Sequence, residues 1–507
     1  MSSNAVQTKV EVAREIELGT KGEQIDLSVL LPEENVSNIL SVNASVVVDK
    51  YEALLGELSV SGVACLNVVY MLDDGTVSNH KTCQDFSFKI EDISFDPSSI
   101  VKILPNVVDV EIEKVNGNSF KVKLSLENTI SLVKNQEINI FQNEDADVFV
   151  KQSEIQLVKH CSRNCQTFTL NSVFETKLPV SRILNISSVV AVNKADALDG
   201  IVVFEGEATT RMLYVSNDER PLLVSLINKD MFREEVEDTN ATRESTVKGF
   251  ATILANNIEE NVDSENKTVE VLIPVKICYD LFESENVTVT ADAYSTKSDL
   301  ELVTEAFVST EFKGTENFIT KLDGNITLDA DAISIDKVLA VDGAYFTVQS
   351  QNYEDGQLDV DGTIHLNLIY LGDEDKIDAV QLQVPYSFKE KIGDAENATV
   401  TCQIVEIDAT VKRGHDVYVD GKILTTVSLS NETQTAIITE MTKGEEYGAR
   451  DGAIEIFFAD QGKTFWDVAK ELRVSQEVLK TQNSDIVEPF EKPEKIVFFD
   501  GKEIEIE

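Results

Sequence analysis

The chain has 507 residues, of which 90 are acidic and 44 basic, so its formal net charge is −46. This length suggests about three to five domains, and a hydrophobic content of 42% supplies the material for their cores. A field of this sign repels phosphates, which argues against a nucleic-acid partner. The sequence has no apolar run long enough for a transmembrane helix. It begins without the basic and apolar regions of a secretory signal, so we expect a cytosolic protein.

The cysteines are too sparse for a disulfide framework. They lie at positions 65, 83, 161, 165, 278 and 402. Cys65 and Cys402 fall in apolar or alternating segments and are expected to be small core residues. The most metal-like group is His160, Cys161 and Cys165, but no second Cys/His pair follows at a zinc-like spacing. We therefore favour a turn with two reduced thiols there and predict no metal and no cofactor.

One pattern recurs three times along the chain, in segments 54–75, 198–219 and 354–375. A glycine is followed eight residues later by a tyrosine, and a phenylalanine comes eighteen residues after the tyrosine. The recurring residues are Gly62, Tyr70 and Phe88, then Gly206, Tyr214 and Phe232, then Gly362, Tyr370 and Phe388. Recurrence at a fixed long period is typical of tandem units. These residue types carry no acid–base or nucleophilic chemistry, and the sequence holds no catalytic motif, so we predict no enzyme and no catalytic residue.

Each repeat is predicted to contain a long, half-buried strand. Apolar residues alternate with polar ones at Leu58, Val60, Ala64, Leu66 and Val68, and again at Leu358, Val360, Ile364, Leu366 and Leu368. This alternation indicates antiparallel sheets with one buried and one solvent-facing side, and the tyrosines continue the buried side. The glycine is expected to mark a bulge or a close approach of another backbone. We predict a mainly β protein with an N-terminal segment 1–20 and three sandwich-like domains at 21–145, 146–308 and 309–445.

Residues 446–507 are predicted to form a small domain of strand, helix, helix and strand. The alternating residues 453–458 predict the first strand. Thr464 is expected to cap the first helix together with Asp467, three residues further on. A second alternating run at 503–507 predicts the closing strand.

This terminal segment resembles a LysM domain. The matching residues are Gly462, Thr464, Trp466, Ala469, Val474, Ser475, Leu479, Asn483 and Gly501. The repeats resemble the SPOCS domain of clostridial spore-coat proteins in the segments 31–42, 56–77 and 86–91. The order of three SPOCS domains followed by one LysM domain is similar to that in the family of spore-coat morphogenetic proteins. The resemblance implies a non-enzymatic adaptor whose LysM domain binds SpoIVA, the ATPase of the coat's basement layer, in the mother-cell cytosol at the forespore surface.

Five residues of the LysM-like segment are predicted to contact the partner. They are Ile454, Lys463, Phe465, Trp466 and Asp467. Trp466 is the only tryptophan, and its large amphipathic ring suits an interface anchor, with packing in the small core as the equal alternative. Lys463 offers charge complementarity or is merely solvated. Of the neighbours Phe457 and Phe458, one is expected in the core and the other on the surface.

Two other functions remain open. A LysM domain binds glycans in many proteins, so the chain is alternatively a peptidoglycan or cortex binder with the β modules as a stalk. Lys463 stands where an acidic residue is usual, and Asp500 where a proline is usual, which weakens the inference of glycan binding. A second alternative is a self-assembling shell protein, although the strong negative charge favours dispersed copies.

Overall fold

The computed structural model describes residues 5–143, 145–219, 221–328, 334–372, 376–448 and 454–500. Strands account for 78% of the residues and helices for 4%, and every strand pair is antiparallel. The prediction of a mainly β, antiparallel protein is therefore confirmed.

The first module consists of two three-stranded sheets that face each other. Its strands are β1 (Ala5–Leu30), β2 (Val36–Leu54), β3 (Glu57–Leu72), β4 (Val77–Glu91), β5 (Ile100–Asn116) and β6 (Ser119–Asn143). The sheets have the orders β1–β6–β5 and β2–β3–β4. Their facing sides enclose one apolar core that contains Leu58, Val68 and Leu124.

The same topology occurs twice more along the chain. The second module has β7 (Val148–Glu175), β8 (Val180–Leu198), β9 (Ile201–Ser216), β10 (Leu223–Glu237), β11 (Thr246–Ile253), β12 (Glu259–Val262) and β13 (Thr268–Ser295). Its sheets are β10–β9–β8 and one in which β13 pairs with β7, β11 and β12. The third module has β14 (Ser298–Thr327), β15 (Ile335–Glu354), β16 (Gln357–Gly372), β17 (Ile377–Lys391), β18 (Asn397–Arg413) and β19 (Asp416–Glu446), in the orders β14–β19–β18 and β15–β16–β17.

Two of the predicted domain limits are wrong. The limit at 308/309 falls inside β14, which begins at Ser298, and most of the segment 1–20 belongs to β1. The reason is that the first and last strands of each module are long and continue past the module core, paired with each other apart from local register shifts.

The repeated glycines lie opposite irregularities in the neighbouring strand. Gly62 pairs with Val48, where the register of β2 shifts, and the same shift occurs opposite Gly206 and Gly362. A Cβ atom on any of the three glycines would overlap a backbone carbonyl oxygen of that strand. Of the two expected alternatives, the close approach of another backbone is confirmed, and the irregularity lies in the neighbouring strand and not at the glycine.

The repeated tyrosines Tyr70, Tyr214 and Tyr370 are buried, as predicted. The phenylalanines are not equivalent, however. Phe88 and Phe388 pair with Val60 and Val360, whereas Phe232 pairs with the glycine Gly206. The β9–β10 loop spans 217–222 against 73–76 for β3–β4, and these two extra residues displace the aromatic position in the second module.

The three modules pack side by side, which covers strand faces that were expected to meet solvent. At one junction, Val69, Leu213 and Ile369 come together from β3, β9 and β16. These residues have the parity opposite to the module cores, and all three are buried. The prediction of one wet face per sheet is wrong here because a neighbouring module replaces water.

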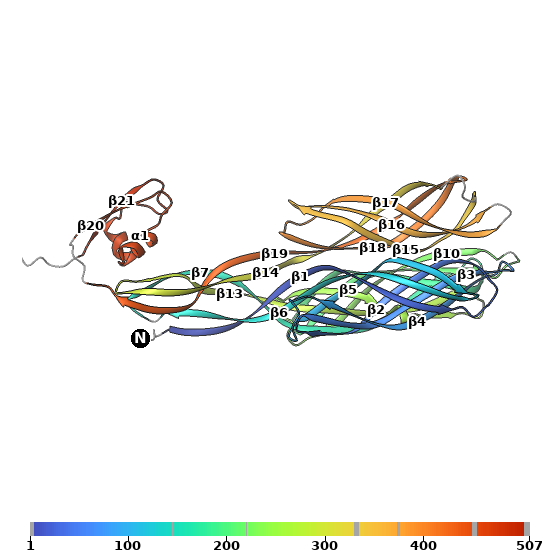
Figure 1. The fold of residues 1–507 in the computed structure, drawn as a ribbon, viewed down its shortest axis with the longest axis horizontal. Helices are drawn as coiled ribbons and strands as arrows, with labels where there is room; N and C mark the ends of the chain where they lie inside the picture. The colour runs from blue at the N-terminus through green and yellow to red at the C-terminus, as the bar shows by residue number, and fades with distance from the viewer. Residues whose placement is uncertain are drawn as a thin grey trace, which may run out of the picture.

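The long ends of six strands leave the modules as three ribbons and form a stalk (Figure 1). The ribbons β1–β6, β7–β13 and β14–β19 share an apolar core with Val12, Ile138, Leu157, Val289 and Ile437. The C-terminal unit lies at the stalk's far end in Figure 1. It comprises β20 (Ile454–Ala459), α1 (Phe465–Leu472), α2 (Gln476–Gln482) and β21 (Glu494–Phe499). β20 pairs with β21, and the predicted closing strand at 503–507 lies outside the described residues.

Candidate functional site

The start of α1 is built as its sequence predicts. The Thr464 side chain accepts from the backbone N–H of Asp467, and the Asp467 carboxylate accepts from the backbone N–H of Thr464 at 2.8 Å. This capping box fixes where α1 begins. Phe465 then points into the core of the unit, where its ring meets the edge of Phe490 at 5.2 Å. The prediction that Phe465 contacts a partner is wrong because the first helical turn directs it inward, and Asp467 serves as a helix cap.

Trp466 is buried at a contact between the C-terminal unit and the stalk. Only 7% of its surface is exposed. Its indole Nε1–H donates to Asp292 Oδ2 of β13 at 2.8 Å, and its ring meets the ring of Tyr294 edge-on at 5.0 Å between centroids. The expectation that this indole lies on an open recognition patch is wrong. Its amphipathic ring does anchor an interface, but the interface lies within the chain.

Lys470 and the residues after α1 complete this contact. Lys470 Nζ lies 2.6 Å from Asp292 Oδ1, and the Tyr294 hydroxyl donates to the Val474 carbonyl at 2.7 Å. Burial alone would raise the pKa of Asp292, but the hydrogen bonds from Lys470 and Trp466 outweigh burial and lower that pKa. Burial raises the pKa of Tyr294 to about 12, so its hydroxyl stays protonated and able to donate. We call the surface formed by Trp466, Lys470 and the Val474 carbonyl the docked face.

The side of the β20–β21 sheet that is turned away from the unit's core carries a second, open surface. Ile454, Ile456 and Phe458 alternate along β20 and are 60%, 51% and 75% exposed. Ile454 pairs with Phe499, which is 48% exposed, and Ile456 pairs with Val497. These five residues form what we call the outer sheet face. Exposed apolar groups gathered on one face mark an interaction surface in a folded protein.

The remaining predicted residues, Ile454 and Lys463, do not lie together on one surface. Ile454 lies on the outer sheet face, and Phe458 is the exposed member of the pair 457–458, as predicted. Lys463 lies beside the unit's core, with its Nζ 5.3 Å from the ring centre of Phe457 and 3.5 Å from Glu471. Ile456 and Phe499 were missed, although the alternation that placed Ile454 on the surface also places Ile456 there.

The segment with His160, Cys161 and Cys165 is a strand and not a turn. His160 Nε2 lies 3.0 Å from Asp280 Oδ1, and Cys165 forms a disulfide with Cys278 directly opposite on β13. Cys161 is unpaired, and burial raises the pKa of its thiol to about 11. Within the described ranges, no group of three His, Cys, Asp or Glu side chains is placed to hold a metal ion.

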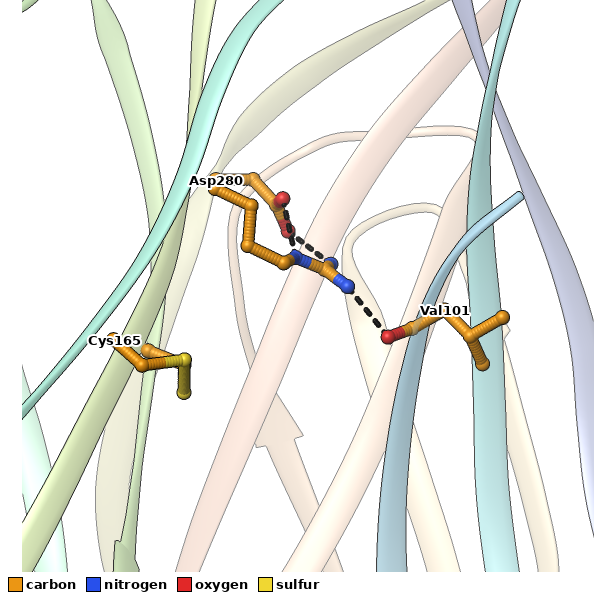
Figure 2. The surroundings of a disulfide bond; sticks show 5 residues. Val101, Cys165 and Asp280 are labelled. Atoms are coloured by element: carbon orange, nitrogen blue, oxygen red, sulfur yellow. Dashed lines mark hydrogen bonds and ion pairs between the residues drawn. A yellow bond between two sulfur atoms is a disulfide. The ribbon is translucent and has the colours of Figure 1, made fainter. Parts of the chain in front are cut away.

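Arg163 completes the neighbourhood of this disulfide (Figure 2). It pairs with Asp280 and donates to the carbonyl of Val101 on β5, so it joins the first and second modules. Burial would raise the pKa of Asp280, but hydrogen bonds from His160 and Arg163 lower it. The arrangement therefore stabilises a module junction.

The expectation of reduced cysteines is wrong for two pairs. Cys65 and Cys83 face each other on β3 and β4 with their Cα atoms 4.1 Å apart, and they are bonded, as are Cys165 and Cys278. Strand pairing brings these residues together, and their spacing in the sequence does not reveal it. Cys402 is unpaired and buried, as expected.

A cavity of about 1240 Å³ lies where the three modules meet. Lys248 of the second module pairs with Glu15 of the first and lies 3.8 Å from Glu17. Lys102 Nζ lies 5.0 Å from the ring centre of Phe250, and burial together with the nearby Lys248 lowers the pKa of Lys102 to about 8. The charges in this cavity compensate one another across the module boundary.

Comparisons of the chain with protein-family models, with curated proteins and with solved structures gave no match. In the part of the chain that the structure describes, no helix is long and apolar enough to cross a membrane.

Proposed function

We propose that this chain is a non-enzymatic assembly adaptor of the spore coat. In this proposal the LysM-like C-terminal unit binds the basement-layer ATPase SpoIVA, and the three SPOCS-like modules present that unit at the forespore surface, in the cytosol of the mother cell. The proposal takes the identity of the partner from the resemblance of the sequence to the coat family.

The observation that carries the proposal is the outer sheet face. Aliphatic and aromatic side chains on one flat surface lose water-exposed apolar area when a partner covers them. Phe458 and Phe499 provide the large rings that dominate the binding energy in many protein interfaces. This face points away from the core of the unit, so a partner can reach it without disturbing α1 or α2.

The arrangement of the modules supports a scaffold role. Apolar contacts join the modules at the junction of Val69, Leu213 and Ile369, and others join the ribbons of the stalk. An array held together at both places carries the C-terminal unit at a fixed end. Presentation of a binding unit, and not chemistry, is what such an architecture offers.

The test is a pull-down with purified SpoIVA by the full chain and by the Ile456→Glu/Phe458→Glu variant. We expect the variant to lose at least about tenfold in affinity because two charges enter the apolar contact. The control is Ile93→Glu, because Ile93 is 97% exposed on the first module, far from the C-terminal unit in sequence. Unchanged fluorescence of Trp466 shows that the variant unit is folded. Wild-type binding by the folded variant contradicts the proposal.

The two alternative functions give different results in the same framework. Titration with chitin or peptidoglycan oligomers detects a glycan binder, and saturable binding of these sugars replaces the adaptor proposal. Sedimentation of the isolated chain detects a shell protein, which forms large ordered polymers, whereas an adaptor remains small.

A further inference from the structure

A short extended segment of the chain occupies the docked face. The segment is Asp292-Ala293-Tyr294, close to the end of β13 at the tip of the stalk. The pairing of β13 with β7 is irregular between Thr290 and Asp292. A bulge of this kind redirects the side chains that follow it. Asp292 and Tyr294, two positions apart, then project to the same side, toward α1.

Specific groups of α1 and of the residues that follow it bind both side chains of this segment. Trp466 and Lys470 are four residues apart on α1, which places them on one face of the helix. They bind the two different oxygens of the Asp292 carboxylate, at 2.8 Å and 2.6 Å. A neutral donor and a cation on one carboxylate form a charge-assisted pair with defined geometry.

Tyr294 is bound through both its ring and its hydroxyl. The ring packs against the indole of Trp466 on one side and is stacked with Phe149 at 5.3 Å. The hydroxyl reaches the buried carbonyl of Val474 at 2.7 Å. A phenylalanine in this place would leave that buried carbonyl without its donor, which disfavours phenylalanine relative to tyrosine.

We propose that the docked face is a binding site for an extended Asp-x-Tyr sequence, which segment 292–294 fills within the chain and a partner carrying the same motif fills in exchange. This inference goes beyond the proposed function, which places its partner on the outer sheet face, and it does not depend on that function. Its chemistry follows from the occupant already seated on it. Lys470 and Asp292 remain partly open to solvent, with 44% and 28% of their side chains exposed, so a competing carboxylate can approach the ammonium group.

The test uses the full chain, because Trp466 is its only tryptophan and reports the site directly. The variant Asp292→Ala/Tyr294→Ala vacates the docked face, and we expect its emission to shift to the red as the indole meets water. The control Asp323→Asn changes an exposed carboxylate elsewhere on the stalk-forming strand β14. We expect its emission to match the wild type.

A synthetic peptide with the sequence of residues 287–297, VTVTADAYSTK, is then titrated into the vacated variant. We expect it to reverse the red shift in a saturable manner. The matched peptide VTVTANAFSTK, which lacks the carboxylate and the phenol, should need at least tenfold higher concentration. Lys470→Gln, added to the vacated variant, should weaken binding of the first peptide and leave binding of the second unchanged.

Two outcomes overturn this inference. One is an unshifted emission in the vacated variant, because the segment then does not hold the indole. The other is equal binding of both peptides, or no binding of either, by a variant whose circular dichroism matches the wild type. If the vacated variant does not fold, the Asp292→Asn chain provides the same comparison, since loss of its carboxylate frees Lys470 for the carboxylate of the first peptide, which should then compete for the docked face while the second peptide does not. The assay contains no coat protein, so its result is independent of the SpoIVA pull-down.

Discussion

Replacement of Gly206 by alanine should destabilise the second module. The new Cβ atom would overlap the carbonyl oxygen of Ala191, and it would lie 2.6 Å from Cε1 of the Phe232 ring. The carbonyl belongs to the backbone of β8, which is hydrogen-bonded to β9 and cannot move by itself. The overlap must therefore shift the strand or rotate the ring.

The magnitude follows from the behaviour of overpacked cores. Forcing one extra methyl group into a filled site costs about 1–3 kcal/mol. For a domain of about 150 residues, each kcal/mol lowers the midpoint of thermal unfolding by about 2–4 °C. We therefore expect Gly206→Ala to lower the unfolding temperature of this module by about 2–12 °C.

Gly22 supplies the matched control for this prediction. It also lies within a strand, β1, but the nearest atom to a Cβ there is the Leu126 carbonyl oxygen at 4.0 Å. Gly22→Ala should thus be neutral or should stabilise by about 0.4–1 kcal/mol, because alanine restricts the unfolded chain. Thermal unfolding followed by circular dichroism compares the two variants. If Gly206→Ala unfolds at the same temperature as Gly22→Ala, the account of the repeated glycine is wrong.

Three further predictions concern charge and sulfur. Because the folded-state pKa of Asp292 is lowered, the docked contact should be complete above the ordinary pKa of about 4 and be lost only as the pH falls through the lower folded-state pKa. A red shift of Trp466 emission in acid measures this loss, and no shift contradicts it. Lys102→Met should raise the unfolding temperature, since its pKa of about 8 implies that the buried charge costs up to about 3 kcal/mol at neutral pH. Lys248→Met should lower the unfolding temperature, because it leaves the nearby carboxylates unpaired. Equal changes of the unfolding temperature in these two variants would refute the roles given to Lys102 and Lys248. Alkylation of the unfolded, unreduced chain should label two thiols and leave four protected until a reductant is added, whereas six labelled thiols would show that the cell kept both pairs reduced.

The local structure of the modules was predictable because side-chain alternation reports burial directly. Tyr70, Tyr214 and Tyr370 continue the parity of their strands, and all three are in the core. A glycine at a position of the buried parity, such as Gly62 between Val60 and Ala64, indicates a backbone approach for the same local reason. The first helix of the C-terminal unit was equally accessible, since Thr464 and Asp467 form its capping box within four residues.

Contacts between distant segments could not be read in the same way. Cys165 and Cys278 are separated by 113 residues, and only the pairing of β7 with β13 places them opposite each other. The burial of Val69 depends on two other modules, so alternation within β3 cannot reveal it. From the sequence, core packing and a partner surface were equal alternatives for Trp466. Its burial depends on a contact with Asp292, which is 174 positions away.

The sequence predicted one partner-binding patch that included both Ile454 and Trp466. In the C-terminal unit these residues lie on two separate faces. The indole and Lys470 hold the unit to the stalk through one carboxylate, while the alternating side chains of β20 remain open. A chain with a charge of −46 repels its own copies, which keeps an exposed apolar sheet from pairing with another of the same kind. A partner that brings compensating charge removes this repulsion as it covers the apolar residues. The acidity that argues against nucleic acid and self-assembly therefore also supports the selection of a different protein at the outer sheet face.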